Sequence, residues 1–244
     1  MRYVIFSDVH ANLEALERVL AHAARAQPDA YVCLGDVVGY GPNPNECVAR
    51  VRDLGAGTVA GNHDRAAVGA VDLGRFSPVA RAAIEWTQGA LDPAARAWLA
   101  ALPLRRDVGG CLAVHGSPRD PIEEYLLDLP GALANFAAEP FACCFVGHTH
   151  VPGAFALEPD GRVGATELPP GSAVRLRPEV RYLINVGSVG QPRDGDPRAS
   201  YLVFDDRAAT VTLRRVPYAL EKTQAKIAAV ALPPLLAERL AIGR

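Results

Sequence analysis

Residues 1–20 read MRYVIFSDVHANLEALERVL, in which an apolar run, a polar motif and a helix signature follow one another. The run Tyr3 to Phe6 predicts a buried strand. The motif Asp8-Val9-His10 comes next, and Asn12 is a typical N-cap for a helix whose apolar stripe begins at Leu13. This order of strand, polar loop and helix is typical of an α/β protein.

Four further polar motifs also follow apolar runs. They are Gly35-Asp36, Gly61-Asn62-His63-Asp64, His115-Gly116 and Gly147-His148-Thr149-His150, after runs at Tyr31–Leu34, Thr58–Ala60, Cys111–Val114 and Phe141–Val146. Five of the 6 histidines fall in these motifs and in the first one. Such clustering of a scarce residue indicates a shared chemical site.

The motifs are expected to meet because the carboxyl ends of parallel strands converge on one crevice. In an extended segment residues i and i+2 face the same way, so Asp8 and His10 can bind one ion. His148 and His150 have the same spacing, but they could be shared between neighbouring ions. Imidazoles, carboxylates and one amide suit Mn, Fe, Zn or Ni, rather than calcium or a thiolate-bound metal.

The sequence after His150 has a different pattern. Runs at 182–186, 200–204 and 210–216 predict an antiparallel, half-buried sheet, and a helix from about Leu220 to Leu240 is expected to break at Pro233-Pro234. Before His150, strands, polar motifs and helices alternate along the chain. The two patterns together predict an α/β fold, a four-layer αββα sandwich of two mixed sheets flanked by helices.

The length of 244 residues fits a single domain over 1–244. Alanine-rich helical insertions are expected near 66–102, broken at Pro78 and Pro93, and near 122–138. Their role is not evident from the sequence.

The composition excludes several classes of partner and environment. A formal net charge of −2 and a pI near 6.3 give no general attraction to nucleic acid or anionic membranes, so no stable nucleic-acid or membrane binding is expected. The 5 cysteines lack paired spacing, which favours reduced core thiols and a cytoplasmic location. We expect no cleaved signal peptide, because the first strand leads directly into a ligand motif. The oligomeric state cannot be deduced from the sequence.

The five motifs, in this order and spacing, resemble those of the calcineurin-like metallophosphoesterase superfamily. The later run from Asn185 to Arg193, NVGSVGQPR, resembles a small bacterial branch grouped with the YfcE-type phosphodiesterases and with diadenosine-tetraphosphatase-like proteins. The resemblance implies a dinuclear centre with two divalent metal ions. Manganese is the expected metal, with iron, zinc or nickel as alternatives.

The resemblance also implies a role for each motif residue. The first metal would be held by Asp8, His10 and His150, the second by Asn62, His115 and His148, and Asp36 would bridge both. His63 would protonate the leaving oxygen, and Asp64 would orient its ring. With two ions, two carboxylates and a bridging hydroxide, the centre would keep a charge of about +1, which attracts phosphate.

Some side chains remain open to structural interpretations. Asp8 and Asp36 could be turn formers, and His63 with Asp64 could be a structural pair. Arg193 is the candidate for binding a substrate phosphate; Arg65 is a weaker one, and either could be a surface arginine. His22 lies outside every motif and is interpreted as a surface residue.

The expected function is a dinuclear metal-dependent phosphoesterase. It would hydrolyse a small phosphodiester, with a nucleotide as one candidate, or a phosphomonoester, by attack of a metal-bridging hydroxide with His63 as general acid. The alternatives are a non-catalytic metal-binding scaffold of the same fold and a phosphoprotein phosphatase. A DNA nuclease would need a basic track, which the sequence lacks.

Overall fold

The computed structural model describes residues 1–166 and 168–244, and within them the strands form two mixed sheets. The first sheet contains β1 (Arg2–Phe6), β2 (Ala30–Cys33), β3 (Gly57–Thr58), β9 (Ala173–Arg175), β11 (Ala199–Asp205) and β12 (Thr210–Val216), in the spatial order β3-β2-β1-β11-β12-β9. The second contains β4 (Arg105–Val108), β5 (Cys111–Val114), β6 (Cys143–Val146), β7 (Gly153–Leu157), β8 (Val163–Thr166) and β10 (Arg181–Asn185), in the order β4-β5-β6-β10-β7-β8.

Each sheet has a parallel part, and the remaining strands are added antiparallel. In the first sheet β1, β2 and β3 run parallel, and in the second β5, β6 and β10 do. The parallel strands are the ones that end at the polar motifs, apart from β10, which ends at Asn185. Their carboxyl ends therefore present the motif residues on one edge of the paired sheets.

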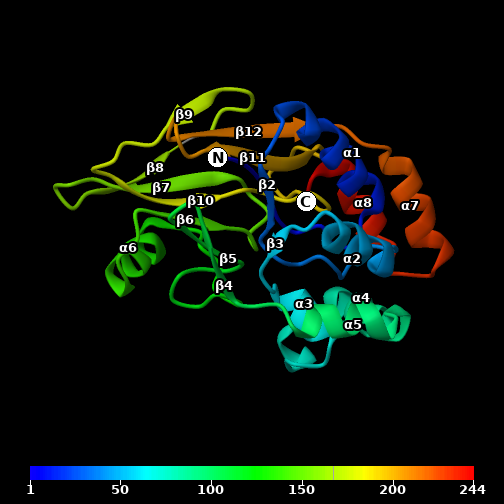
Figure 1. The fold of residues 1–244 in the computed structure, drawn as a ribbon. Coiled ribbons are helices and arrows are strands. Elements are labelled where there is room, and N and C mark those ends of the chain that lie inside the picture. The colour runs from blue at the N-terminus through cyan, green and yellow to red at the C-terminus, as the bar shows by residue number, and fades with distance from the viewer. Residues whose placement is uncertain (167) are drawn as a thin grey trace.

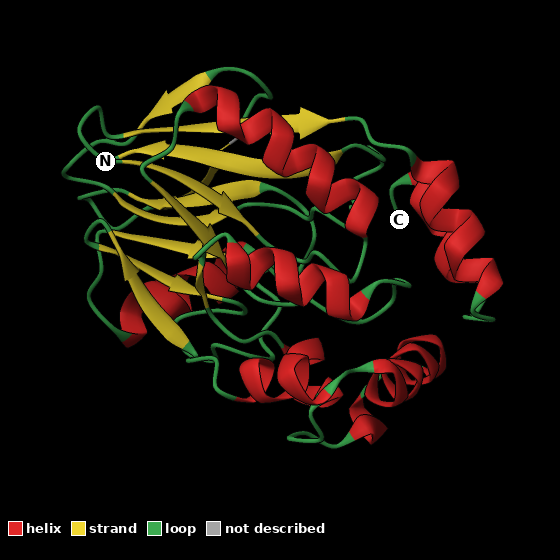
Figure 2. Cartoon of the chain, turned by 45° about the vertical axis from the view of Figure 1, so that its right-hand side comes forward, coloured by secondary structure: helices red, strands yellow, loops and turns green. Residues whose placement is uncertain are grey.

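Helices connect the strands and cover the outer faces of the sheets (Figures 1 and 2). They are α1 (Leu13–Ala23), α2 (Pro44–Asp53), α3 (Asn62–Ala67), α4 (Pro78–Ala90), α5 (Pro93–Ala100), α6 (Leu129–Ala138), α7 (Leu220–Ala229) and α8 (Leu235–Ile242), with short 3-10 turns η1 (Ala24–Ala26) and η2 (Leu73–Arg75). The outer face of the first sheet packs on α1, α2 and α5, and the second sheet packs on α6. This is the αββα sandwich expected from the sequence.

Strand β1 shows why its apolar run is continuous. Val4 and Phe6 are buried against the helices, in one cluster with Leu16 of α1. Ile5 points the other way, into the core between the sheets, where it shares a cluster with Phe145 of β6. Because successive side chains of a strand point to opposite faces, a strand with a core on both sides must be apolar at every position.

Helix boundaries follow the expected signals. The Asn12 side chain accepts a hydrogen bond from the Ala15 amide at 3.2 Å, so it caps α1, and Glu14 lies in the first turn. The predicted C-terminal helix is interrupted at Pro233-Pro234, which separates α7 from α8. Both helices pack beside α4 in a separate apolar cluster.

Two expectations about the elements differ from the structure, and three short edge strands were not predicted. The strands after His150 do not form a sheet of their own, because β10 and β7 pair within the second sheet while β11 and β12 pair within the first. Of the insertion predicted near 122–138, only α6 is helical. Asp120 holds the amides of Ile122 and Glu123 in a turn at 3.1 and 3.0 Å, and Asp128 caps α6. Edge strands β4, β8 and β9 are short and lacked a recognisable alternation.

Two further features concern the whole chain. All of the cysteines are buried free thiols. No helix in residues 1–166 or 168–244 combines the length and the apolar character that a membrane crossing requires.

Candidate metal centre

The loops that follow the parallel strands are bonded to one another by their backbones. The Asp8 amide donates to the Gly35 carbonyl at 3.0 Å, and the Gly147 amide donates to the His115 carbonyl at 2.9 Å. A link between the two sheets comes from the His148 amide, which donates to Asp8 Oδ2 at 3.1 Å. The motifs of both sheets therefore form one contiguous site.

Most of the candidate ligands adopt a left-handed backbone conformation. Positive φ angles occur at Asp8 (53°), His10 (48°), Asp36 (50°), His148 (65°) and His150 (60°). Such a conformation costs of order 1–3 kcal/mol at each non-glycine residue, and it is concentrated at functional sites. It also corrects the expected geometry, because Asp8 and His10 converge through a tight turn rather than through an extended segment.

Asp8, His10 and His150 form the first group of donor atoms. His150 Nε2 lies 3.2 Å from Asp8 Oδ1 and 3.1 Å from His10 Nε2. His10 Nε2 lies 3.8 Å from Asp8 Oδ1. All three side chains are buried, so their donor atoms face one another away from bulk solvent.

Asn62, His115 and His148 form the second group. His115 Nε2 lies 3.1 Å from Asn62 Oδ1 and 3.1 Å from His148 Nδ1. Asp36 lies between the groups, because its Oδ2 is 3.6 Å from His10 Nε2 and 3.5 Å from His115 Nε2. The structure thus brings together all seven predicted ligands and separates His148 from His150, one in each group.

The histidine tautomers make the inner faces of both groups electron-rich. In each ring, the nitrogen that faces away from the donor group (the outer nitrogen) points at a backbone carbonyl. The pairs are His10 Nδ1 with Val38 (3.2 Å), His115 Nδ1 with Leu34 (2.8 Å), His148 Nε2 with Glu123 (3.2 Å) and His150 Nδ1 with Gln191 (2.6 Å). A carbonyl only accepts, so the outer nitrogen carries the proton and the inner nitrogen presents a lone pair. Burial, the main cause, lowers the pKa of all four rings, which keeps them neutral.

Divalent cations fit this arrangement. Lone pairs that face each other at 3.1 Å repel unless a positive charge lies between them. Within the described part of the chain, the buried atoms Asp8 Oδ1 and Asp36 Oδ2 also lack a hydrogen-bond partner. Burial, followed by the charges of Asp64 and Asp8, raises the pKa of Asp36 well above its usual value, and a bound cation would reverse this shift.

His63 lies beside the two groups, at the start of α3. Its amide donates to Asp36 Oδ1 at 2.8 Å, and its ring contacts the Tyr40 ring with the centroids 4.4 Å apart. Its Nδ1 is buried without a hydrogen-bond partner among the described residues. Burial, then the positive charge of Arg193, holds the pKa of His63 well below its usual value.

Asp64 does not have the position predicted for it. Its carboxylate accepts from the Gly61 amide at 3.1 Å and from the Val38 amide at 3.2 Å, rather than from the ring of His63. The reason is that neighbouring residues of a helix point in different directions, so Asp64 faces back to cap α3 while His63 faces the site. Asp64 therefore holds the loops together, and the orienting role predicted for it is not met by a direct contact.

A cavity of about 310 Å³ opens beside the candidate metal centre. Its lining includes Asn62, His63 and His148 of the motifs and also Arg193, whereas Arg65 is not among the lining residues. Arg193 Nη2 lies 3.4 Å from the Tyr40 hydroxyl and 3.3 Å from Gln191 Oε1. The other predicted outlier, His22, lies on α1 and shares a 2.8 Å hydrogen bond with the Tyr201 hydroxyl.

The cavity also contains residues that the sequence analysis missed. They come from the loop after Asp36, from both insertions and from α8: Tyr40, Arg75, Phe76, Ser77, Ala80, Glu123, Tyr125 and Arg239. Tyr40 follows the Asp36 loop closely in the sequence, which was a usable signal. The other residues lie far from every motif along the chain, so only the fold could reveal them.

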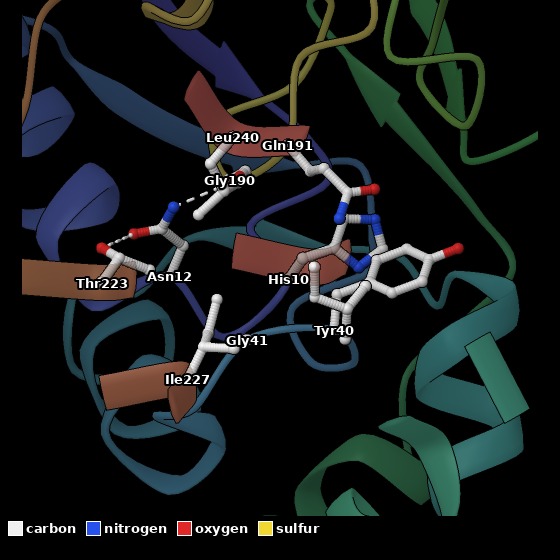
Figure 3. Close-up of a pocket in the computed structure, with 10 residues that line it drawn as sticks. His10, Asn12, Tyr40, Gly41, Gly190, Gln191, Thr223, Ile227 and Leu240 are labelled. Atoms are coloured by element: carbon white, nitrogen blue, oxygen red, sulfur yellow. Dashed lines mark hydrogen bonds between the residues drawn. The ribbon is translucent and has the colours of Figure 1, made fainter. Parts of the chain in front are cut away.

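Helix α7 is linked by hydrogen bonds to the loops of the candidate metal centre. Asn12 Nδ2 donates to the Gly190 carbonyl at 2.9 Å, and the Thr223 hydroxyl of α7 donates to Asn12 Oδ1 at 2.9 Å. Figure 3 shows these bonds on one side of a small pocket, with His10 and Tyr40 on the other. Gly190 in turn donates its amide to the Asp8 carbonyl at 2.8 Å, so α7 supports the loop that carries the first donor group.

The fold and the paired donor groups define a candidate metallophosphoesterase. Residues 1–208 match the model of the calcineurin-like phosphoesterase superfamily domain, and the chain belongs to this superfamily. This confirms the family predicted from the five motifs.

Individual relatives agree with this assignment. The chain is 39% identical to the uncharacterized protein MJ0912 of Methanocaldococcus jannaschii, over 98% of this chain and 97% of the relative. A crystal structure of a metallophosphoesterase from Sphaerobacter thermophilus is 46% identical, with a TM-score of 0.89, and the match covers 100% of this chain and 99% of that one. The hypothetical protein PH1004 from Pyrococcus horikoshii, at 18% identity, shares the fold with a TM-score of 0.81, over 100% and 98% of the two chains.

Proposed function

We propose that this protein is a two-metal phosphoesterase that hydrolyses small phosphate esters. The observation that carries the proposal is the convergence of two groups of buried, uncharged imidazoles around unpaired carboxylate oxygens. Asp8, His10 and His150 would hold one divalent ion, and the other would be held by Asn62, His115 and His148, with Asp36 shared. When bound, the ions supply positive charge and acidify water enough to provide a nucleophile near neutral pH.

The metal we expect is Mn²⁺, with Fe, Zn or Ni as alternatives. The proposed ligands are imidazoles, carboxylates and one amide oxygen, and such a mixed nitrogen and oxygen set favours these metals over calcium. The cysteines are buried outside the two donor groups, so thiolate ligation plays no part in the proposal.

The substrate phosphate would be oriented by Arg193. This guanidinium lines the cavity next to the donor groups, and Tyr40 and Gln191 fix its direction. A planar guanidinium matches two phosphate oxygens at once, which orients the ester for in-line attack.

His63 would donate the proton to the leaving oxygen. It lines the same cavity, and its backbone is fixed by Asp36. Burial keeps its ring neutral in the free chain, and a phosphate anion bound beside the ring favours the protonated form. General acid catalysis of this kind typically contributes about 10²–10⁴-fold to the rate.

A phosphodiester is the preferred substrate class in this proposal. The support is the resemblance of the run from Asn185 to Arg193 to small bacterial phosphodiesterases. The alternative of a non-catalytic scaffold is weaker, because neither a candidate ligand nor the acid histidine is missing. A phosphoprotein phosphatase is also weaker, because the cavity is lined by side chains of both insertions and of α8, which suits a small molecule.

The test is hydrolysis of bis-p-nitrophenyl phosphate and p-nitrophenyl phosphate by chain loaded with Mn²⁺. We expect turnover of the diester, and loss of about 10²–10⁴-fold in kcat for His63→Gln with metal content unchanged. His22→Gln is the matched control, because His22 lies on α1, away from the donor groups. If the metal-loaded protein hydrolyses neither ester, the proposed function is wrong.

A further inference from the structure

Three arginines from distant parts of the chain line the cavity beside the candidate metal centre. Arg75 comes from η2 in the first insertion, Arg193 from the loop after β10, and Arg239 from α8. Arg239 lies beyond residue 208, where the match to the superfamily model ends. The cationic wall therefore includes a residue from outside the part of the chain that matches the superfamily model.

The position of Arg239 is built into the packing. Leu236 and Leu240 of α8 are buried in one apolar cluster with Ile227 of α7 and Ala83 of α4. The Arg239 side chain also donates from Nε to the Arg244 carbonyl. Since α4 contributes Ala80 to the cavity, α4 and α8 together form the wall that carries this guanidinium.

Acidic side chains neutralise these guanidinium groups only in part, because Glu123 is the one carboxylate among the described residues of the cavity lining, and it lies near Arg75. Arg75, Arg193 and Arg239 form no ion pair with an acidic side chain in residues 1–166 or 168–244, in contrast to surface arginines such as Arg81, which pairs with Glu85. Burial and the charge of Arg193 lower the pKa of Arg239, as expected for cations held close together.

The cavity has more positive charge than one phosphate requires. Its lining contains three arginines and one carboxylate, Glu123, which leaves about two positive charges in addition to those of any bound metal. A single phosphodiester carries one negative charge, and Arg193 already serves it in the proposed function. With Glu123 counted, about one positive charge then remains, and it belongs to Arg75 and Arg239.

We propose that Arg75 and Arg239 form a second anion subsite, so that the preferred substrate carries another phosphate group besides the one that is hydrolysed. The inference rests on the proposed function and specifies its substrate class. Guanidinium groups suit this task because they bind phosphate oxygens in pairs. Phe76 and the half-exposed ring of Tyr125 offer aromatic faces for the organic part of the substrate between the phosphates.

The test compares two chromogenic diesters that differ by one phosphate, thymidine 5′-(p-nitrophenyl phosphate) and the same ester phosphorylated at the 3′ oxygen. Mn²⁺-loaded protein is expected to prefer the 3′-phosphorylated ester by about tenfold or more in kcat/KM, the effect of one good charge-assisted contact. In Arg75→Gln/Arg239→Gln the ratio should fall close to one. Arg81→Gln, an exposed arginine of α4, is the control and should keep the wild-type ratio.

A binding measurement separates this inference from the proposed function. Isothermal titration of the Mn²⁺-loaded chain with thymidine 3′,5′-bisphosphate and with thymidine 5′-monophosphate requires no turnover. We expect the bisphosphate to bind about tenfold more tightly, and the double variant to lose the difference. Equal affinities, or a preference that survives in the double variant, would overturn the second subsite even if both esters are hydrolysed. Absent hydrolysis with a preserved binding difference would instead refute only the proposed function.

Discussion

Substitution of Gly39 by alanine is expected to impair turnover selectively by displacing His63. Gly39 has a φ of +92°, and a Cβ at this position would lie 2.4 Å from His63 Nδ1 and 3.0 Å from its Cγ. Ordinary contact needs about 3.5 Å, so the ring must move by about 1 Å. A misplacement of that size at a reacting group costs about 10²-fold in rate, and the positive φ costs a further ~1–2 kcal/mol of stability.

The assay is kcat for bis-p-nitrophenyl phosphate at saturating Mn²⁺, with metal content measured on the same samples. Gly89→Ala is the matched control, because Gly89 lies on α4 with open space around its Cβ position. We expect Gly39→Ala to retain its metals and lose about 10²-fold in kcat, while the control keeps wild-type turnover. Wild-type turnover in a fully metallated Gly39→Ala protein would refute the assignment of His63 as the proton donor.

Three other perturbations test the surrounding structure. Gly61→Ala should reduce metal content, because the new Cβ would lie 2.0 Å from Asp36 Oδ1; a full complement of metal would contradict the bridging position. Removal of metal by EDTA should lower Tm by roughly 5–10 °C, reversibly, since a ligand at a hundredfold excess over Kd stabilises by about 2.7 kcal/mol; an unchanged Tm would argue against buried metals. Burial, then Arg25, lowers the pKa of His22, so the unfolded chain takes up the proton first as pH falls through about 6.5 and folding stability is lost. Between pH 8 and pH 5 the wild type should therefore lose more free energy of unfolding than His22→Gln does, as measured by urea unfolding. An equal loss in both proteins would exclude a lowered pKa of His22 in the folded chain.

The residues that the sequence singled out lie together in the structure because the signals that mark them are local. Each ligand motif follows an apolar strand directly, and the topology of parallel strands brings such ends together regardless of the intervening chain. The family assignment and the sandwich architecture were confirmed for the same reason. The left-handed turns at Asp8 and His10 were not foreseen, since non-glycine residues adopt them only where the surrounding contacts enforce them.

Features that depend on tertiary contacts could not be predicted. From the sequence, the carboxylate of Asp64 could face either the His63 ring or the backbone. It faces the backbone because the amides of Gly61, at the start of α3, and of Val38 donate to it. Arg75 and Arg239 reach the cavity because η2 and α8 pack there, and nothing in their local sequence indicates it. The segment before α6 is rich in helix-compatible residues, but the turn on Asp120 prevents a longer helix.

The most direct test of the account is a crystal of the protein grown with Mn²⁺ and measured near the manganese absorption edge. We predict two anomalous peaks, one among Asp8, His10 and His150 and the other among Asn62, His115 and His148, with Asp36 in contact with both. A single peak, or two peaks of which either lacks Asp36 as a ligand, would contradict the dinuclear centre.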